Sequence, residues 1–405
     1  MRKRLLILGT GFASYALLRR IDTRAYDVTV VSPRNHFVFT PLLPSTTVGT
    51  IEFRTVVESI RAARRGVTFL SGRVARLDLL QRRAVCEGPD GGPGWEQPFD
   101  LLAVGVGCVT NTFGTPGVAE HAHFLKEVED ARAIRQRLIA NLERASLPGV
   151  APDERSRLLH FVAVGAGPTG VRFAAELYDL LRKELPVSYP HLAGEVRVSV
   201  VDAGGAALSA YDELLREYVG RVFQRRGVAF HFNARVASVG GDGVRLADGR
   251  CLPCGLVLWC AGFARNPLVA GLEVPKDAAG RVVTDEHLQI HGMPGLYAMG
   301  DCARPASGPL PQLAQVAEQQ GRYLAARLNG RTAEPFRWRP WGVSSYIGQG
   351  AAVSESPGGG QLSGFWAYQQ WRVATWSQLT SARSRVLVPL DRLRAFLFGR
   401  ELSRV

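Results

Sequence analysis

The chain has 405 residues, of which 46% are hydrophobic and 21% are charged, and its formal net charge is +13. This composition excludes a disordered chain and allows two or three domains with large cores. The positive charge is mostly arginine, without the motifs of RNA-binding proteins, so it favours an anionic lipid surface or an anionic substrate over nucleic acid.

No stretch approaches the ~20 apolar residues that a membrane-spanning helix requires. The cysteines are scattered, and a chain of this length needs no disulfide bridges, so we expect a reducing compartment. The pair Cys251 and Cys254 has no second pair at zinc-ribbon spacing. We therefore interpret it as structural and predict no metal site.

The first predicted element is a short apolar strand, Leu5–Leu8, which leads into a turn and a helix. The turn carries Gly9, Gly11 and Ser14 in the spacing G-x-G-x-x-S. A second apolar strand follows at Val28–Val31. A strand, a glycine turn, a helix and a strand in this order predict a doubly wound parallel sheet that binds a dinucleotide.

The same pattern returns later in the chain. The strand Phe161–Val164 is followed by Gly165, Gly167 and Gly170 and then by a helix, with the alternating strand Val196–Val201 farther on. One glycine turn is weak support for a nucleotide site, but two turns, each between a strand and a helix, are strong support.

Each turn suits a pyrophosphate for physical reasons. The first glycine permits the tight turn, the second lets the phosphate approach the backbone, and the third position must be small so that helix and strand pack closely. Free N–H groups at the helix start and the helix dipole then favour an anion.

The residue at the end of the second strand indicates which nucleotide is bound. In the later block this residue is Asp202, whose carboxylate can accept hydrogen bonds from both ribose hydroxyls and repels a 2′-phosphate, which favours NADH over NADPH. The earlier block ends in Ser32-Pro33-Arg34 without an acid. Ser32 could bond a ribose and Arg34 could face the phosphates, so the residues alone leave the first nucleotide open.

Two further strands end in glycine turns, at Gly105 and Gly262. In two-dinucleotide flavoproteins such turns close over the bound nucleotide. Asp301 follows another strand, where its carboxylate suits the ribityl hydroxyls of a flavin, or alternatively caps a helix N-terminus. The predicted fold is therefore α/β, with two Rossmann-like doubly wound dinucleotide-binding domains, the second inserted in the first, and a C-terminal membrane-anchoring region.

We place the domain boundaries where composition and pattern change. The segments are a first part of the first dinucleotide-binding domain at 1–125, a connecting helical segment at 126–156, the second dinucleotide-binding domain at 157–275, a second part of the first domain at 276–336, and a C-terminal region at 337–405. The family resemblance given below implies that the first domain binds FAD and the second binds NADH, and that the C-terminal region serves as anchor and dimerisation region.

Taken together, the motifs resemble those of the type II, or alternative, NADH:quinone oxidoreductases, and most of all their mitochondrial branch. The resemblance covers nearly the whole chain, and its marks are Gly9–Gly11, Ser32–Pro44, Asn111–Val118, His123–Glu127, Gly165–Val171, Ala314–Gln319 and Ser381–Arg385.

The resemblance implies that the first domain holds FAD, although its strand lacks an acid, and that the second binds NADH. It places Pro41 and its neighbours to Pro44 beside the isoalloxazine, and it places Gln315 and Gln319 along the quinone pocket. The helix that begins near Pro311–Gln315 would point its positive end at the flavin and stabilise the anionic reduced form.

One position departs from the family pattern. The family usually has a glutamate after the second glycine turn, near the flavin and the pocket, whereas this chain has Arg172. Glu176, one helical turn later, is retained. The reversal of charge puts in doubt any proton relay assigned to that glutamate, and we count both residues among the candidate catalytic groups.

The tail has the composition of a segment that binds a membrane surface. Residues 365–405 hold seven arginines against Asp391 and Glu401, interleaved with aromatic residues and leucines. We predict a helix that opens at Pro389 and presents Leu390, Leu393 and Leu397 on one face, with Val386 in line upstream and arginines beside them. The alternative is that this segment packs on the body or forms a dimer interface.

The predicted reaction is hydride transfer from NADH to FAD, followed by transfer of two electrons to a membrane quinone, without proton pumping. A homodimer at the surface of the mitochondrial inner membrane is expected, with the cytoplasmic face of a bacterial membrane as the alternative; whether a presequence was removed stays open. A disulfide reductase would need paired cysteines between residues 32 and 60, where the chain has none. A sulfide:quinone oxidoreductase, a ferredoxin-reductase-like enzyme and a non-catalytic sensor of FAD and NADH remain as alternatives.

Overall fold

The computed structural model describes residues 2–403, which cluster into two compact units, each built from separate stretches of chain. Among the described residues, the first unit comprises 2–38, 57–109 and 263–340, and the second comprises 39–56, 110–262 and 341–403. The division into five segments made from the sequence stays a prediction.

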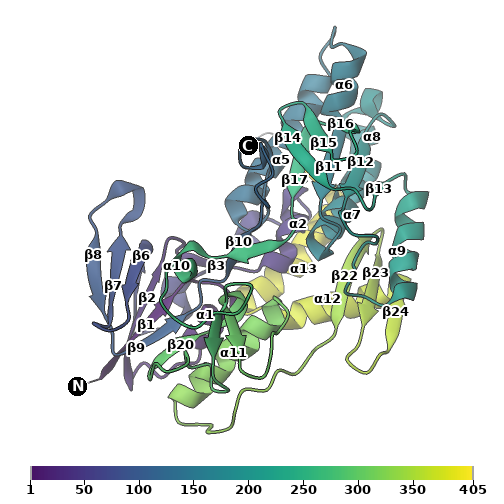
Figure 1. Ribbon diagram of the computed structural model, residues 1–405. Coiled ribbons are helices and arrows are strands. Elements are labelled where there is room, and N and C mark those ends of the chain that lie inside the picture. The colour runs from purple at the N-terminus through teal and green to yellow at the C-terminus, as the bar shows by residue number, and fades with distance from the viewer. Residues whose placement is uncertain (1, 404–405) are drawn as a thin grey trace. The chain divides into compact units, whose positions relative to one another are not determined.

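A parallel sheet with strand order β20–β9–β1–β2–β5 forms the centre of the first unit (Figure 1). Its strands are β1 (Lys3–Leu8), β2 (Tyr26–Ser32), β5 (Val67–Ser71), β9 (Leu101–Val104) and β20 (Leu296–Ala298). Leu5 pairs with Val28 on one side and with Leu101 on the other. Because both faces of such a sheet are covered, the central strand β1 contains a continuous apolar run, and its residues 5–8 are all buried.

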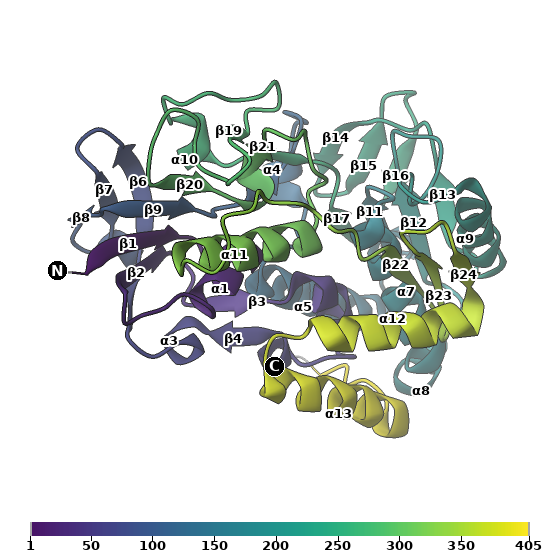
Figure 2. The same ribbon diagram turned by 90° about the horizontal axis from the view of Figure 1, so that it is seen from below.

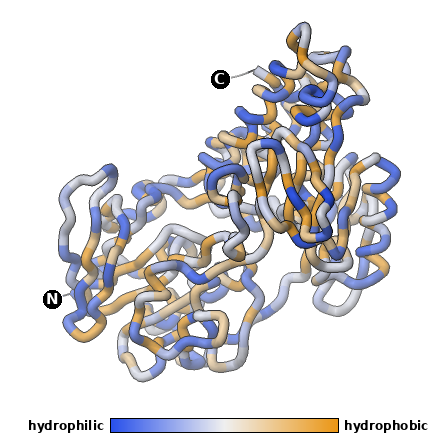
Figure 3. Tube along the Cα trace, turned by 45° about the horizontal axis from the view of Figure 1, so that its top comes forward, coloured by the Kyte–Doolittle hydropathy of each residue, from blue (hydrophilic) through white to orange (hydrophobic). Residues whose placement is uncertain are grey.

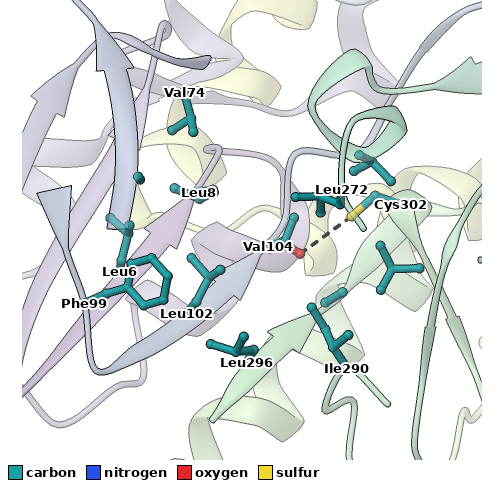
Figure 4. Close-up of a cluster of buried hydrophobic side chains, with 14 of the residues drawn as sticks. Leu6, Leu8, Val74, Phe99, Leu102, Val104, Leu272, Ile290, Leu296 and Cys302 are labelled. Carbon is teal, nitrogen blue, oxygen red and sulfur yellow. Dashed lines mark hydrogen bonds between the residues drawn. The ribbon is translucent and has the colours of Figure 1, made fainter. Parts of the chain in front are cut away.

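Apolar side chains from well-separated parts of the chain meet on one face of this sheet (Figure 4). Leu6 and Leu102 come from the sheet, Phe99 from the approach to β9, and Ile290 and Cys302 from the last stretch of the unit. The Cys302 thiol donates a weak hydrogen bond to the Val104 carbonyl at 3.6 Å. Cys302 is therefore buried as a small hydrophobic residue whose S–H group has a weak acceptor.

Helices α1 (Phe12–Leu18) and α11 (Ala314–Leu328) pack against each other, as Figure 2 shows. Gly321 of α11 permits this approach, because a Cβ there would lie 2.1 Å from the Ala13 carbonyl oxygen. The other elements of the unit are β3 (His36–Val38), β4 (Val57–Ser59), α3 (Ile60–Ala63), β6 (Arg73–Asp78), β7 (Arg83–Glu87), η3 (Pro89–Gly91), β8 (Trp95–Pro98), β18 (Phe263–Arg265), α10 (Pro267–Ala270), β19 (Val282–Thr284), η5 (Gly300–Cys302) and β21 (Ala303–Pro305), and β10 (Cys108–Thr110) begins at its end.

The second unit repeats the arrangement with a parallel sheet in the order β13–β12–β11–β17. Its strands are β11 (His160–Val164), β12 (Arg197–Val201), β13 (Ala229–His231) and β17 (Leu256–Trp259). Hydrophobic and hydrophilic stretches alternate along the chain trace, as Figure 3 shows. The other elements before residue 262 are η1 (Thr40–Leu42), α2 (Leu43–Thr47), η2 (Phe53–Thr55), α4 (Val118–His121), α5 (Val128–Ala145), α6 (Pro152–Leu158), α7 (Pro168–Lys183), α8 (Leu185–Ser188), η4 (Pro190–Leu192), α9 (Glu213–Arg225), β14 (Val236–Gly240), β15 (Gly243–Leu246) and β16 (Cys251–Pro253).

The C-terminal part of the second unit is an antiparallel sheet followed by two helices. The strands are β22 (Val343–Gly348), β23 (Ala351–Glu355) and β24 (Gln361–Ser363), and the helices are α12 (Gly364–Gln378) and α13 (Ala382–Phe398). β22 packs on α7, and α12 packs on β23. Within residues 2–403 the structure contains no helix long and apolar enough to cross a membrane.

The predicted start of the last helix is wrong. The helix begins at Ala382, not at Pro389, because the Ser381 hydroxyl accepts a hydrogen bond from the Ser384 backbone N–H at 3.0 Å and caps the first turn. Pro389 lies inside the helix on an exposed position. Arg392 also differs from the prediction, because its guanidinium turns inward over the Trp371 ring instead of flanking the leucines.

Candidate functional site

The first glycine turn joins β1 to α1. Gly9 has φ +85°, and a Cβ there would lie 2.7 Å from the Gly105 carbonyl oxygen, so both the turn and the close approach require glycine. Gly11 has an ordinary backbone conformation, and a Cβ there would meet no atom within 4 Å. Ser14 donates to the Leu8 carbonyl at 3.0 Å and joins helix to strand.

The different surroundings of the three small residues in this turn fit a pyrophosphate cradle. The positions of Gly9 and Ser14 are fixed by packing within the protein, whereas Gly11 faces open space at the N-terminus of α1. A missing side chain without a steric reason in the protein indicates room for something else, and a helix N-terminus favours an anion. The residues present therefore fit the phosphates of FAD.

At the end of β2, Ser32 and Arg34 both meet Thr10 of the glycine turn. The Ser32 hydroxyl lies 3.3 Å from the Thr10 hydroxyl, and the Arg34 Nε–H donates to Thr10 Oγ1 at 3.2 Å. The structure thus brings Ser32 and Arg34 to the turn, while their contacts with a ribose and with phosphates stay predictions.

Asp301 lies in η5, directly after the strand β20. The helix cap at this position is Met299, so the alternative interpretation of Asp301 as an N-cap is wrong. Instead, the Asp301 carboxylate accepts a hydrogen bond from the Cys108 thiol at 3.2 Å. Its contact with ribityl hydroxyls stays a prediction.

Helix α11 begins at Ala314, and no side chain caps its N-terminus. Gln315 lies in the first turn and is partly exposed. Gln319 is held firmly, because its side-chain amide donates to the Arg339 carbonyl at 2.8 Å and accepts from the Arg339 N–H at 3.0 Å. An uncapped helix start leaves N–H groups that can face an anionic group, as the sequence predicts for Ala314 and Gln315.

The second glycine turn, between β11 and α7, repeats the geometry of the first. Gly165 has φ +108°, and its missing Cβ would lie 3.0 Å from the Ala261 nitrogen. A Cβ on Gly170 would lie 2.0 Å from the Gly165 carbonyl oxygen, whereas one on Gly167 would meet nothing within 4 Å. The middle glycine again faces open space, as a bound pyrophosphate requires.

Asp202 comes directly after β12, at the position that the sequence predicts to select the nucleotide. Its carboxylate accepts hydrogen bonds from the Ala166 N–H at 2.6 Å and from the Gly204 N–H at 2.7 Å. The carboxylate is therefore fixed beside the glycine turn. At the end of β17, Gly262 has φ +68° and accepts a hydrogen bond from the Asn111 N–H at 3.3 Å.

Helix α7 carries both candidate catalytic residues of this unit on one buried face. Glu176 is only 3% exposed and accepts hydrogen bonds from the Ser45 hydroxyl at 2.6 Å and the Thr50 hydroxyl at 2.8 Å. These hydroxyls belong to the segment that contains Pro41. No local sequence pattern indicates Ser45 or Thr50, because their hydrogen bonds to Glu176 join distant parts of the chain.

Arg172 lies one turn earlier and is also buried. Its guanidinium donates to the Pro41 carbonyl and lies over the Trp371 ring, 5.6 Å from the ring centroid. The Nε atom has no hydrogen-bond partner within residues 2–403. Burial lowers the pKa of Arg172, yet a guanidinium remains charged at any ordinary pH, so Arg172 cannot relay protons as a carboxyl group does.

The two parallel sheets with their glycine turns define a class, the flavoproteins with two dinucleotide-binding folds. A family model described as pyridine nucleotide-disulphide oxidoreductase matches residues 3–321, and one described as NDH2 C-terminal domain matches residues 342–401. The chain belongs to this oxidoreductase family, in its branch of type II NADH dehydrogenases.

Relatives similar over nearly their full length support this assignment. The chain is 37% identical to a "Probable NADH dehydrogenase" of Dictyostelium discoideum, over 99% of this chain and 91% of that protein. It is also 37% identical to an internal alternative NAD(P)H-ubiquinone oxidoreductase A1, mitochondrial, of Solanum tuberosum, over 100% of this chain and 88% of that protein.

Solved structures confirm the fold. The structure of NDH2 from Plasmodium falciparum in complex with NADH superposes with a TM-score of 0.94 at 24% identity, over the whole of both chains. The sulfide:quinone oxidoreductase of Aquifex aeolicus superposes with a TM-score of 0.73 at 16% identity, over 98% of this chain and 96% of that one. At these identities the similarity concerns the fold alone.

Proposed function

We propose that the chain is an FAD-dependent NADH:quinone oxidoreductase that does not pump protons. The observation that carries the proposal is the pair of glycine turns whose middle glycines, Gly11 and Gly167, each face open space at a helix start. Two such cradles in one chain suit a resident flavin nucleotide and a nicotinamide substrate. The names of the relatives described above as NAD(P)H-ubiquinone oxidoreductases support a quinone as the second substrate.

When bound, FAD supplies the group that takes hydride from NADH and passes two electrons to a quinone. The protein binds and orients the partners. Gly9, Gly11 and Ser14 shape the cradle for FAD, with Gly105, Asp301, Ser32 and Arg34 around it. Gly165, Gly167, Gly170 and Gly262 shape the cradle for NADH, and Asp202 selects the nucleotide at its edge.

For the quinone side we propose Gln315, Gln319, Glu176 and Arg172. The Gln319 amide is fixed by its two hydrogen bonds to the Arg339 backbone, so it is a polar group of fixed position. Glu176 is held by two hydroxyl groups, and Arg172 fixes the carbonyl of Pro41, the residue expected beside the flavin. Rigid polar groups of this kind orient a planar substrate without moving during turnover.

The reduction of a quinone requires access from a lipid phase, and we propose that α12 and α13 provide it as a peripheral membrane surface. Apolar side chains on these helices are largely exposed, namely Phe365, Trp366, Val373, Trp376, Val386, Leu390, Leu393, Phe396, Leu397 and Phe398. Exposed apolar residues interleaved with arginines suit an interface with anionic lipid.

The cellular site and the assembly are further proposals. Because relatives are named as mitochondrial proteins, we propose the mitochondrial inner membrane, with a bacterial cytoplasmic membrane face as the alternative. We also propose a homodimer, formed through the same C-terminal region.

The nucleotide assignment is tested at Asp202. Replacement of a charged hydrogen-bonding group costs about 1.5–3 kcal/mol, so Asp202→Ala should weaken NADH binding by roughly 10- to 150-fold. Binding of NADPH should weaken less, because the repulsion of its 2′-phosphate is lost at the same time. An unchanged dissociation constant for NADH would refute the ribose assignment.

The overall reaction is tested by rapid mixing without oxygen. The purified protein should be yellow, lose its colour on mixing with NADH, and recover it when a soluble quinone is added. A protein that binds NADH without bleaching would be a nucleotide sensor. Bleaching that a quinone does not reverse would exclude the quinone as electron acceptor.

A further inference from the structure

Arg400, which follows helix α13, reaches back into the buried surroundings of Glu176. Its Nη2 atom lies 3.7 Å from the Glu176 carboxylate, and its side chain is only 10% exposed. The Arg400 Nε–H donates to the Thr50 hydroxyl at 2.8 Å, and this same hydroxyl donates to Glu176. Glu176 therefore meets Arg400 both directly and through Thr50.

Two features hold the arginine in this position. Gly399 has φ +79°, a left-handed conformation that glycine adopts readily, and ends the helix there. Glu184, at the end of α7, lies 3.2 Å from Arg400 Nη1 and accepts a hydrogen bond from the Arg400 backbone N–H. Arg400 is thus placed by its own contacts and does not depend on Glu176 to order it.

Other charged groups surround the same carboxylate. Arg172 and Asp179 face it from α7, Arg392 faces it from α13, and Tyr346 faces it from β22. The guanidinium carbons of Arg172 and Arg392 lie 5.6 Å and 4.7 Å from the centroid of the Trp371 ring, so both groups contact the aromatic face. Among the described residues, Arg400 is the one that forms an ion pair with Glu176.

We infer that Arg400 is a positioning residue for quinone reduction, which acts through Glu176. It keeps the buried Glu176 paired, both directly and through the Thr50 hydroxyl, and thereby fixes the Glu176 carboxylate against the segment that carries Pro41. The inference rests on the proposed function, because it assumes that Glu176 takes part in the quinone half of the reaction. A buried carboxylate that loses its cation is destabilised and favours its protonated form.

The chain offers a matched control for this inference. Arg394, on α13, forms an ion pair with Glu52 in the same segment, so Arg394→Gln also removes an arginine contact between the C-terminal helix and residues 39–56. This pair is about half-exposed, and the structure gives Arg394 no contact with Glu176. A general loosening of the C-terminal helix would therefore affect both variants, whereas the inferred role affects only Arg400→Gln.

The experiment compares the full-length, FAD-loaded wild type with Arg400→Gln and Arg394→Gln. The rate of flavin reduction by NADH and the turnover with a soluble short-chain quinone are measured across pH, together with the thermal midpoint. We expect Arg400→Gln to lower quinone turnover about tenfold or more, the equivalent of ~1.4 kcal/mol, and to leave flavin reduction within about twofold. The acid side of its pH profile should move to higher pH. Arg394→Gln should match the wild type in quinone turnover and in the pH profile.

A double variant tests the route of the effect. If Arg400 acts through Glu176, then adding Arg400→Gln to Glu176→Gln should change quinone turnover no further, because the two substitutions remove one interaction. Additive losses in the double variant would overturn the inference, as would an Arg400→Gln profile that keeps its wild-type shape while both half-reactions slow together.

The remaining outcomes are also decisive. If Arg400→Gln does not fold, Arg400→Lys provides the alternative variant. Lysine keeps the positive charge but lacks the several N–H donors of the planar guanidinium. Arg400→Lys should therefore show the wild-type pH profile with a raised KM for the quinone. An unrestored profile in a folded Arg400→Lys protein contradicts the inference. A wild type that bleaches with NADH and never reduces a quinone would instead refute the proposed function itself.

Discussion

The guanidinium carbon of Arg172 lies 5.6 Å from the centroid of the Trp371 ring, and the same guanidinium donates to the carbonyl of Pro41. Arg172 of α7 thus connects the segment 39–56, which contains Pro41, to the C-terminal helix α12, which contains Trp371. The charge reversal at position 172 is therefore accommodated by an aromatic ring and a backbone carbonyl, both of which favour a cation.

Arg172→Glu should damage this junction. The variant loses a buried cation–π contact worth about 2 kcal/mol and places a second carboxylate one turn from Glu176. We expect a lower thermal midpoint and altered KM and pH dependence with a soluble quinone, while Arg172→Lys, which can still contact the ring, should lose less. Identical pH–rate profiles for the wild type and Arg172→Glu would mean that this position is not coupled to the chemistry.

A pair of glycine substitutions separates binding of FAD from folding. Gly11→Ala adds a methyl group into open space and should fold normally, but this methyl group occupies the expected place of the pyrophosphate. We expect Gly11→Ala to purify as a folded protein with little flavin. Gly9→Ala should fail to fold, because φ is +85° and the methyl group would lie 2.7 Å from the Gly105 oxygen. Full flavin content in Gly11→Ala would contradict the assignment of the cradle.

Much of this cradle geometry was predictable from sequence, because it depends on neighbouring residues. A strand, three small residues at fixed spacing and a helix specify the turn locally, and the structure places Gly9, Gly11 and Ser14 accordingly. The contact between Arg400 and Glu184 joins residues 216 positions apart, and no local pattern indicates it. The predicted start of α13 at Pro389 was wrong because proline is common at helix starts, whereas Ser381 provides the side-chain cap at the actual start.

His160, at the start of β11, should make stability depend on pH. Its Nδ1 lies 2.7 Å from the Pro253 carbonyl oxygen and its Nε2 lies 2.9 Å from the Ser199 hydroxyl, an arrangement that suits the neutral ring. Burial lowers the pKa of His160 in the folded protein below its ordinary value of ~6.5. As pH falls below ~6.5 the unfolded chain takes up the proton first, so the contribution of His160 is present above that pH and is lost below it.

Thermal unfolding at about pH 7.5 and pH 5.5 checks this expectation, since the two values bracket the ordinary pKa of histidine. His160→Gln keeps a polar group that can reach the Ser199 hydroxyl but cannot titrate, so its midpoint should fall less on acidification than that of the wild type. His191→Gln, on an exposed position, should behave as the wild type. Equal acid sensitivity in His160→Gln and the wild type would show that His160 is not responsible.

The exposed side of α13 should determine membrane binding. Truncation near residue 364 is a poor test, because it removes the buried Trp371 together with Arg400. The double variant Leu393→Asp, Phe396→Asp changes only side chains that are 51% and 72% exposed. Each apolar side chain buried in lipid contributes about 1.5–3 kcal/mol, so binding to vesicles with anionic lipid should weaken by roughly 100-fold or more.

Turnover with a soluble quinone should persist in this double variant, because neither position contacts Glu176. Leu80→Asp serves as the control: this leucine is 90% exposed on the turn between β6 and β7 of the first unit, and its replacement should leave vesicle binding unchanged. Flotation of the three proteins with vesicles makes the comparison directly. If the double variant floats as well as the wild type, α13 does not provide the membrane contact, and its apolar face is then better explained as the surface between two copies of the chain.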